Sequence, residues 1–187
     1  MKFGESIEVR FQVPTLYEQL AYYLAAGMWK EADEETNKLM LQVAGREQQG
    51  YLDLDDIRQF PCEDLRTIDQ LWVQYSDGHF GFSVQKEIFL DSGGILSGNQ
   101  ANSPFNKLLL LPPVRWIYVR RVRDDDFKNY EAYERFTIRV GWKVNERWNE
   151  LNTRFADKGY LPKTLRELNT YKGTSGGTLS LLSRPDL

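Results

Sequence analysis

Three closely spaced aspartates are the first residues of this chain whose types and positions could do chemistry. Asp53, Asp55 and Asp56 have the spacing that begins a calcium-binding loop. Such a loop also needs a glycine at its sixth position and a glutamate at its twelfth, and this chain has Arg58 and Asp64 there. We therefore expect these aspartates to cap a short helix, because carboxylates stabilise the positive amino-terminal end of a helix.

The chain has one histidine and one cysteine, which restricts metal binding and nucleophilic catalysis. His79 follows Asp77-Gly78, so we expect an exposed turn residue, and one histidine cannot build a histidine-rich metal site. Cys62 follows Pro61 at the start of a helical pattern, where the helix dipole can lower the pKa of a thiol. No base accompanies this thiol, so we expect it to be buried and structural. We also expect that the protein is not an enzyme.

A basic and aromatic cluster lies between residues 114 and 123. Trp116 and Tyr118 alternate there with arginines, and stacking combined with phosphate contacts would suit single-stranded nucleic acid. Three aspartates follow at 124–126, and the whole chain has a net charge of -3. We therefore expect an edge strand, whose arginines prevent further strand pairing, and no binding to nucleic acid.

A second stretch, 142–162 with its flanking residues, also combines rings with cations. Its apolar and basic members are Trp148, Phe155, Tyr160 and Leu161 beside Arg147, Arg154, Lys158, Lys163 and Arg166. A flat apolar molecule with peripheral carboxylates would need this combination, because rings remove its surface from water and cations bind its carboxylates. Alternatively, the rings pack against helices and the cations are solvated. The residues alone favour this second interpretation.

Apolar periodicity predicts the helices that must position these groups. Pro14 opens a first helix with the stripe Leu16, Leu20 and Leu24, and a second helix over about 29–44 packs against it. In the second helix, Asp33 is expected to face water with its charged neighbours. Further helices are expected at 53–60, 61–75 and 82–90, and through Tyr130, Tyr133, Phe136 and Val140.

Two segments have the pattern of β-strands. Residues 5–13 alternate apolar and polar side chains, and residues 114–122 are β-branched and aromatic. We expect them to pair as a small antiparallel ribbon. Because an isolated ribbon is marginal in water, it would pack on the helices or join two copies in a homodimer. We expect one domain over 1–187, with a strand extension at 1–13, an insertion at 95–127 and a loosely packed tail at 172–187.

The composition is that of an ordinary globular protein. The chain has 187 residues, of which 41% are hydrophobic and 27% charged, which suits a single domain. Its longest apolar run, 108–111, stops at Pro112 and Pro113 and is too short to span a membrane. The start lacks the pattern of a signal peptide, and one cysteine cannot form an internal disulfide. We therefore expect a cytoplasmic protein without a transmembrane segment.

Several long motifs resemble the genomes-uncoupled-four (GUN4-like) family. The most specific runs from Phe60 to Trp72 and continues with residues 80–86. The other similar segments are 24–33, 39–47, 51–53, Gly93-Gly94, Phe136 with 139–142, 159–162 and 180–184. The resemblance covers most of the chain apart from the first dozen residues and about 95–127. At Tyr160 this chain departs from the histidine of the family.

The resemblance implies an all-α helical bundle that binds protoporphyrin IX or magnesium protoporphyrin IX without a covalent bond. It implies a non-catalytic regulator of chlorophyll biosynthesis that acts through magnesium chelatase. The large subunit of that enzyme would be a partner, and the protein would lie peripherally at photosynthetic membranes. The alternative is a divergent member of the family that serves as an interaction or signalling module without binding porphyrin.

The resemblance also implies a place for the porphyrin, between residues 45–60 and 143–162. The ligand-binding residues that it implies are Tyr51, Leu52, Phe60, Trp148, Phe155 and Leu161, with Lys163 and Arg166 near the propionates.

Overall fold

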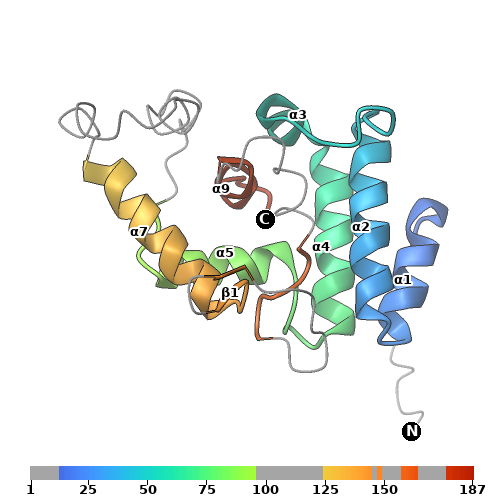
Figure 1. The fold of residues 1–187 in the computed structure, drawn as a ribbon. Coiled ribbons are helices and arrows are strands. Elements are labelled where there is room, and N and C mark those ends of the chain that lie inside the picture. The colour runs from blue at the N-terminus through green and yellow to red at the C-terminus, as the bar shows by residue number, and fades with distance from the viewer. Residues whose placement is uncertain (1–12, 96–123, 145–146, 149–156, 164–175) are drawn as a thin grey trace, which may run out of the picture.

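The computed structural model describes residues 13–95, 124–144, 147–148, 157–163 and 176–187, which are the coloured parts of Figure 1. Its elements are a 3-10 turn η1 (Thr15–Tyr17), the helices α1 (Glu18–Ala25), α2 (Trp29–Val43), α3 (Leu54–Gln59), α4 (Cys62–Tyr75), α5 (Phe82–Asp91), α7 (Asp124–Arg139) and α9 (Gly176–Leu182), and the strands β1 (Lys143–Val144) and β2 (Arg147–Trp148). These bounds confirm the helices expected before residue 95.

Helices α1, α2 and α4 lie side by side and form one half of the fold (Figure 1). Leu20 and Leu24 of α1 are fully buried in the core, as their spacing predicted. Trp72 of α4 is also fully buried, and its indole N–H donates a hydrogen bond of 2.9 Å to the hydroxyl of Thr36 on α2. The ring of Trp29 stacks on Trp72 with a centroid distance of 6.2 Å. The amphipathic pattern of these helices therefore produces a shared aromatic and aliphatic core.

The aspartates before α3 cap that helix, as their positions predicted. Asp53 Oδ1 accepts hydrogen bonds of 2.9 Å from the backbone N–H groups of Asp55 and Asp56. Asp56 Oδ2 accepts a bond of 3.0 Å from the N–H of Asp53, which completes a capping box. A calcium loop is not needed to explain these carboxylates.

Helices α5, α7 and α9 form the other half of the fold. Helix α5 packs against α7 and α9, and α9 packs against α3 (Figure 1). Phe89 of α5 and Phe136 of α7 meet edge to face, with ring centroids 6.0 Å apart. After α7, the two short strands pair antiparallel, with Lys143 opposite Trp148. None of the described helices combines the length and the apolar composition that crossing a bilayer requires.

The structure gives no support to the predicted β-ribbon, and it contradicts the expected loose tail and buried thiol. The ribbon at 5–13 and 114–122 lies outside the described residues except for Val13, which is in no strand, so the structure gives it no support. The extension at 1–13 and most of the insertion at 95–127 also lie outside them. The loosely packed tail at 172–187 is wrong for residues 177–187. Leu179, Leu181 and Leu182 are at most 5% exposed, because α9 packs on both α3 and α5.

Cys62 is exposed rather than buried, because the first turn of α4 presents it to solvent.

Asp69 shows how α4 supports the start of α5. Its carboxylate is 8% exposed, and Oδ1 accepts a hydrogen bond of 2.9 Å from the backbone N–H of Ser83 in the first turn of α5. Burial raises the pKa of Asp69 above its ordinary value of 3.8, although hydrogen bonds from Ser83 and Phe82 oppose the increase. Ionisation of Asp69 therefore lowers the free energy of unfolding, and this decrease develops as pH rises through the raised pKa.

Replacing Asp69 by asparagine should remove that cost while its amide oxygen still accepts the Ser83 hydrogen bond. At pH 7 we expect the variant to have a higher free energy of unfolding than wild type. Well below pH 3.8 this gain should vanish, because the Asp69 carboxyl is then neutral in both the folded and the unfolded protein. Urea denaturation at both pH values measures the difference. A variant that loses the same stability at the two pH values would contradict this account of the carboxylate.

Candidate functional site

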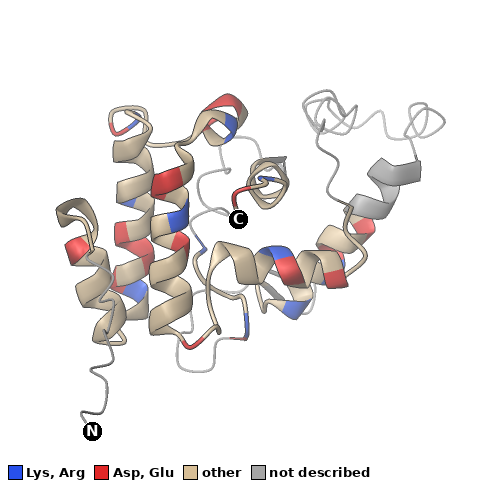
Figure 2. Cartoon of the chain, turned by 180° about the vertical axis from the view of Figure 1, so that it is seen from behind, with Lys and Arg blue, Asp and Glu red and all other residues tan. Residues whose placement is uncertain are grey.

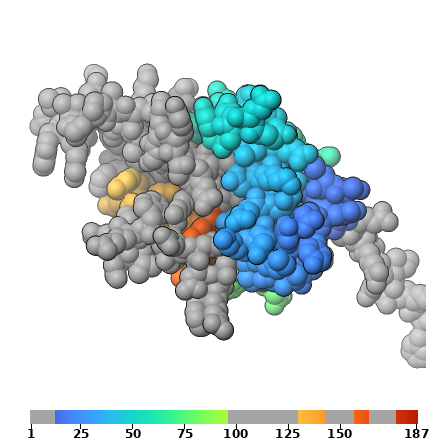
Figure 3. Space-filling view, turned by 45° about the vertical axis from the view of Figure 1, so that its right-hand side comes forward, coloured from blue at the N-terminus to red at the C-terminus, as the bar shows by residue number. Residues whose placement is uncertain are grey.

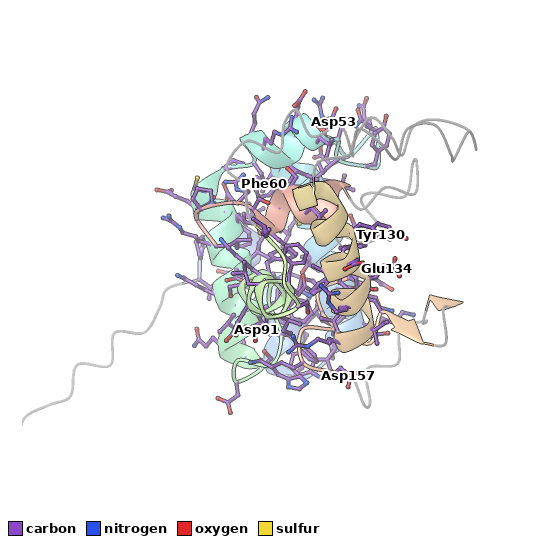
Figure 4. The ribbon with its side chains drawn as sticks, turned by 90° about the vertical axis from the view of Figure 1, so that its left-hand side faces the viewer. Asp53, Phe60, Asp91, Tyr130, Glu134 and Asp157 are labelled. Carbon is purple, nitrogen blue, oxygen red and sulfur yellow. The ribbon has the colours of Figure 1, made fainter. Side chains whose placement is uncertain are left out.

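The two stretches implied as ligand-binding, 45–60 and 143–162, lie in different parts of the fold. Figure 4 shows Asp53 and Asp157 at opposite ends of the helical body. Asp53 precedes α3, and Asp157 begins a segment outside helices and strands. This segment, 157–163, then passes beside α2, as the orange and blue surfaces of Figure 3 show. Residues 159–163 are all buried, so this part of the second stretch belongs to the core of the fold.

The side chains implied as ligand-binding differ in how accessible they are. Leu52 and Phe60 are 2% exposed and Leu161 is fully buried, so these three stabilise the core. Tyr51 is half-buried. Lys163 is 2% exposed. The side chains of Trp148, Phe155 and Arg166 lie outside the described residues, and Trp148 is placed only through its backbone in β2.

Two aromatic residues of the second stretch pack inside the protein. Trp142 is fully buried and Tyr160 is 2% exposed. The indole N–H of Trp142 donates a hydrogen bond of 2.7 Å to the carbonyl of Tyr160. Of the rings that the second interpretation named, Tyr160 is confirmed as packed inside the protein.

The loop between α2 and α3 is held by an ion pair. Arg46 Nη2 lies 2.8 Å from Asp56 Oδ1, and Arg46 Nε donates to the same oxygen at 2.9 Å. Burial alone raises the pKa of Asp56, but the bonds from Arg46 and the Asp53 backbone outweigh burial and lower that pKa. Within this loop Gln49 Nε2 donates to the carbonyl of Tyr51 at 2.9 Å. The local bonds thus fix the backbone that carries Tyr51.

Segment 157–163 carries Lys163 to the surface of α2. The ammonium of Lys163 lies 4.4 Å from the centroid of the Tyr160 ring, within the range of a cation–π contact. The backbone N–H of Lys163 donates a hydrogen bond of 2.8 Å to Asp33 Oδ1. The expectation that the cations of this stretch are solvated is therefore wrong for Lys163, which is buried against the Tyr160 ring.

Sequence reasoning missed two residues that hold this segment. Asp33 is 7% exposed, so the expectation that it faces water is wrong. It is buried because it lies four residues from Trp29 and three from Thr36, on the stripe that packs inward. That spacing could have revealed it. Gln85 of α5 is fully buried and donates to the carbonyls of Gly159 and Pro162. Gln85 lies three residues from Phe82 and from Ile88, so the same kind of spacing could have indicated its burial.

Charge divides unevenly along the chain. Residues 13–95 contain 15 acidic and 6 basic residues, a net charge of -9, and residues 96–187 contain 10 acidic and 16 basic residues, a net charge of +6. Acidic residues follow the helices of the first half (Figure 2). An anionic ligand would therefore be attracted to the later part of the chain.

Within the described residues, no group of three His, Cys, Asp or Glu side chains could hold a metal ion.

Comparison with known proteins identifies similar chains. A family model described as GUN4-like matches residues 11–175. The chain is 28% identical over 165 residues to the tetrapyrrole-binding protein, chloroplastic, of Arabidopsis thaliana, a match that covers 87% of this chain and 52% of that protein. It is 38% identical over 79 residues to the Ycf53-like protein of Synechocystis, covering 41% of this chain and 34% of that one. The chain thus spans about half the length of the Arabidopsis relative and about a third of the length of the Synechocystis relative.

Solved structures have the same fold. The ligand-free structure of Arabidopsis thaliana GUN4 matches with a TM-score of 0.63 and 24% identity, and covers 99% of this chain and 98% of that chain. The structure of GUN4 from Chlamydomonas reinhardtii matches with a TM-score of 0.58 and 20% identity, over 100% and 95% of the two chains. These matches show that the helical architecture is shared along the chain.

Proposed function

This chain belongs to the GUN4-like family, and from that membership we propose that it is a non-catalytic protein that binds a tetrapyrrole. The observation that carries the proposal is the family match over residues 11–175, together with a relative from Arabidopsis thaliana that is named for tetrapyrrole binding. The net charge of +6 over residues 96–187 supports an anionic ligand.

We propose protoporphyrin IX and magnesium protoporphyrin IX as the ligands. Each has a broad apolar macrocycle, whose removal from water is favourable, and propionates that pair with cations. These molecules are the substrate and the product of magnesium chelatase. We therefore propose that the protein regulates chlorophyll biosynthesis through that enzyme, with its large subunit as partner. Its place would be in a photosynthetic compartment, peripheral to the membrane.

The proposed ligand contacts come from both stretches of the chain. Tyr51 would contribute its ring from the α2–α3 loop, and Trp148, Phe155, Lys163 and Arg166 would contribute rings and cations from the second stretch. Leu52, Phe60 and Leu161 stay in the proposal as residues beneath the site, because their burial leaves them little surface for direct contact.

Titration with protoporphyrin IX and with magnesium protoporphyrin IX tests the proposal. We expect saturable quenching of tryptophan fluorescence with both. Trp148→Phe should lose part of the quenching and bind about twofold more weakly, since phenylalanine keeps a smaller ring and loses only part of an aromatic contact worth about 1 kcal/mol. Trp29→Phe is the matched control, because Trp29 stacks within the α2–α4 core, and should bind as wild type does.

The titration can also reject the proposal. Fluorescence that stays unchanged with ligand far above the protein concentration would exclude tetrapyrrole binding. The family fold would then serve an interaction or signalling role instead. Quenching that never saturates would have the same meaning, because it reports non-specific contact of an apolar dye with the protein surface.

A further inference from the structure

Segment 157–163 is a turn followed by residues outside helices and strands, so most of its backbone groups need partners from elsewhere in the protein. These partners come from both halves of the fold. The hydrogen bonds run from Gly159 N–H to His79 O at 2.8 Å, from Gly81 N–H to Leu161 O at 3.1 Å, from Trp142 Nε1–H to Tyr160 O at 2.7 Å, from Gln85 Nε2–H to Gly159 O at 3.0 Å and to Pro162 O at 2.9 Å, and from Lys163 N–H to Asp33 Oδ1 at 2.8 Å. The segment is therefore fixed along its whole length.

Asp33 provides the attachment to α2. A buried carboxylate is costly unless hydrogen bonds compensate for the lost water, and the N–H of Lys163 is one of its donors. This bond fixes the backbone at the residue whose ammonium lies over Tyr160. It also fixes the point from which the chain continues toward Arg166.

Gln85 provides the attachment to α5. One amide group donates to two carbonyls three residues apart, and so holds the backbone on both sides of Tyr160 and Leu161. Its side chain is fully buried, and the distances of 3.0 and 2.9 Å are those of good hydrogen bonds. A side chain of the same shape that could not donate would leave both carbonyls without this partner.

We propose that Asp33 and Gln85 are positioning residues for the tetrapyrrole site, which they serve without contacting the ligand. This inference rests on the proposed function. The proposed ligand residues Trp148 and Phe155 precede segment 157–163 in the chain, and Arg166 follows it. Lys163, which is also a proposed ligand residue, lies in the segment itself, so fixing the segment fixes the backbone of Lys163. Pre-organisation of this kind raises affinity, because less conformational freedom is lost on binding.

Four single variants separate positioning from general stability. Asp33→Ala removes the acceptor, whereas Asp33→Asn keeps an acceptor oxygen and removes the charge. Gln85→Glu keeps the shape but cannot donate to two carbonyls. Glu34→Ala is the matched control, because Glu34 is an exposed neighbour on α2 and its ion pair with Lys30 also lies on the surface.

The measurement is the affinity of each variant for protoporphyrin IX, with circular dichroism to verify folding and amide hydrogen exchange at residues 159–163. We expect Asp33→Ala and Gln85→Glu to bind about tenfold more weakly and to exchange faster in that segment. Asp33→Asn should bind within about twofold of wild type, because its oxygen still accepts the bond. Glu34→Ala should match wild type in both measurements.

The outcomes distinguish this inference from the proposed function. A wild-type protein that does not bind the porphyrin overturns the proposed function, and the inference with it. Wild-type affinity in folded Asp33→Ala and Gln85→Glu, despite faster exchange, overturns the inference alone. Equal losses in Asp33→Ala and Asp33→Asn also overturn it, because the acceptor would then be irrelevant. If Gln85→Glu does not fold, the comparison of the two Asp33 variants decides.

Discussion

Replacing Arg184 by methionine should lower the free energy of unfolding by about 3–5 kcal/mol, the cost of removing one partner from a buried ion pair. Arg184 is 7% exposed, and its guanidinium lies 2.8 Å from Asp186. Its Nη1 donates to the carbonyls of Ile57 and Phe60 at 2.9 and 2.6 Å, where α3 ends. Methionine would leave these carbonyls and the carboxylate without their donor. Urea denaturation followed by circular dichroism measures the loss.

Two further variants make this prediction specific. Arg58→Met removes an exposed arginine that pairs with Asp55 on the surface of α3, and should cost at most about 1 kcal/mol. The double variant Arg184→Met with Asp186→Leu should be more stable than Arg184→Met alone, because it removes the unpaired carboxylate. Equal stability of Arg184→Met and Arg58→Met would show that the buried pair does not hold α9 against α3.

The Arg184 pair also has an expected pH dependence. Burial alone raises the pKa of Asp186, but hydrogen bonding and charge attraction from Arg184 outweigh burial, so that this pKa is lowered from 3.8. The resulting stability is present above pH 3.8 and is lost as pH falls through the lowered pKa. In Arg184→Met this part of the acid dependence should disappear.

Gly81→Ala should be the second most damaging substitution, with a loss of about 3 kcal/mol from backbone strain and overpacking together. Gly81 has a φ of +138°, a conformation that side chains rarely adopt. A Cβ atom there would lie 2.8 Å from Val73 Cγ2 and 2.9 Å from Asp69 Oδ1. The substitution would therefore also disturb the carboxylate that caps α5. Thermal and urea unfolding measure the loss.

Gly78 provides the control for this prediction. Its φ is +72°, but a Cβ atom there would meet nothing within 4 Å. Gly78→Ala should therefore cost only the conformational term, about 1 kcal/mol. Val73→Ala should restore part of the stability of Gly81→Ala, because it makes room for the new methyl group. If Gly78→Ala and Gly81→Ala lose the same stability, contact with α4 has no part in the effect.

The helices before residue 95 could be predicted because their signals are local. Apolar spacing fixed their buried faces, and the aspartates at 53–56 and Pro61 marked where α3 and α4 begin. For Asp33 the same spacing would have indicated burial, but its partner, the N–H of Lys163, lies 130 residues away in the chain and has no local signal. The reasoning from local signals failed for residues 177–187. Their Gly- and Ser-rich surroundings suggested loose packing, but Leu181 and Leu182 are fully buried.

The candidate site could be predicted less well than the fold. The family resemblance is confirmed, and it indicated the two stretches of chain that would bind the ligand. It could not show that Leu52, Phe60 and Leu161 are buried, because burial depends on which distant elements pack over them. It included Gln85 within residues 80–86, but it could not show that this glutamine bridges two backbone carbonyls, because these lie 74 and 77 residues away in the chain.

The way segment 157–163 is fixed has a consequence for the order of folding. Its bonds join Asp33 to Lys163, 130 residues apart, and Gln85 to Pro162, 77 residues apart, while α1 and α2 are neighbours in the chain. Closing long loops costs more entropy than closing short ones and slows folding. In refolding experiments, helix content should therefore return before the capacity to bind porphyrin, which would need the two halves joined.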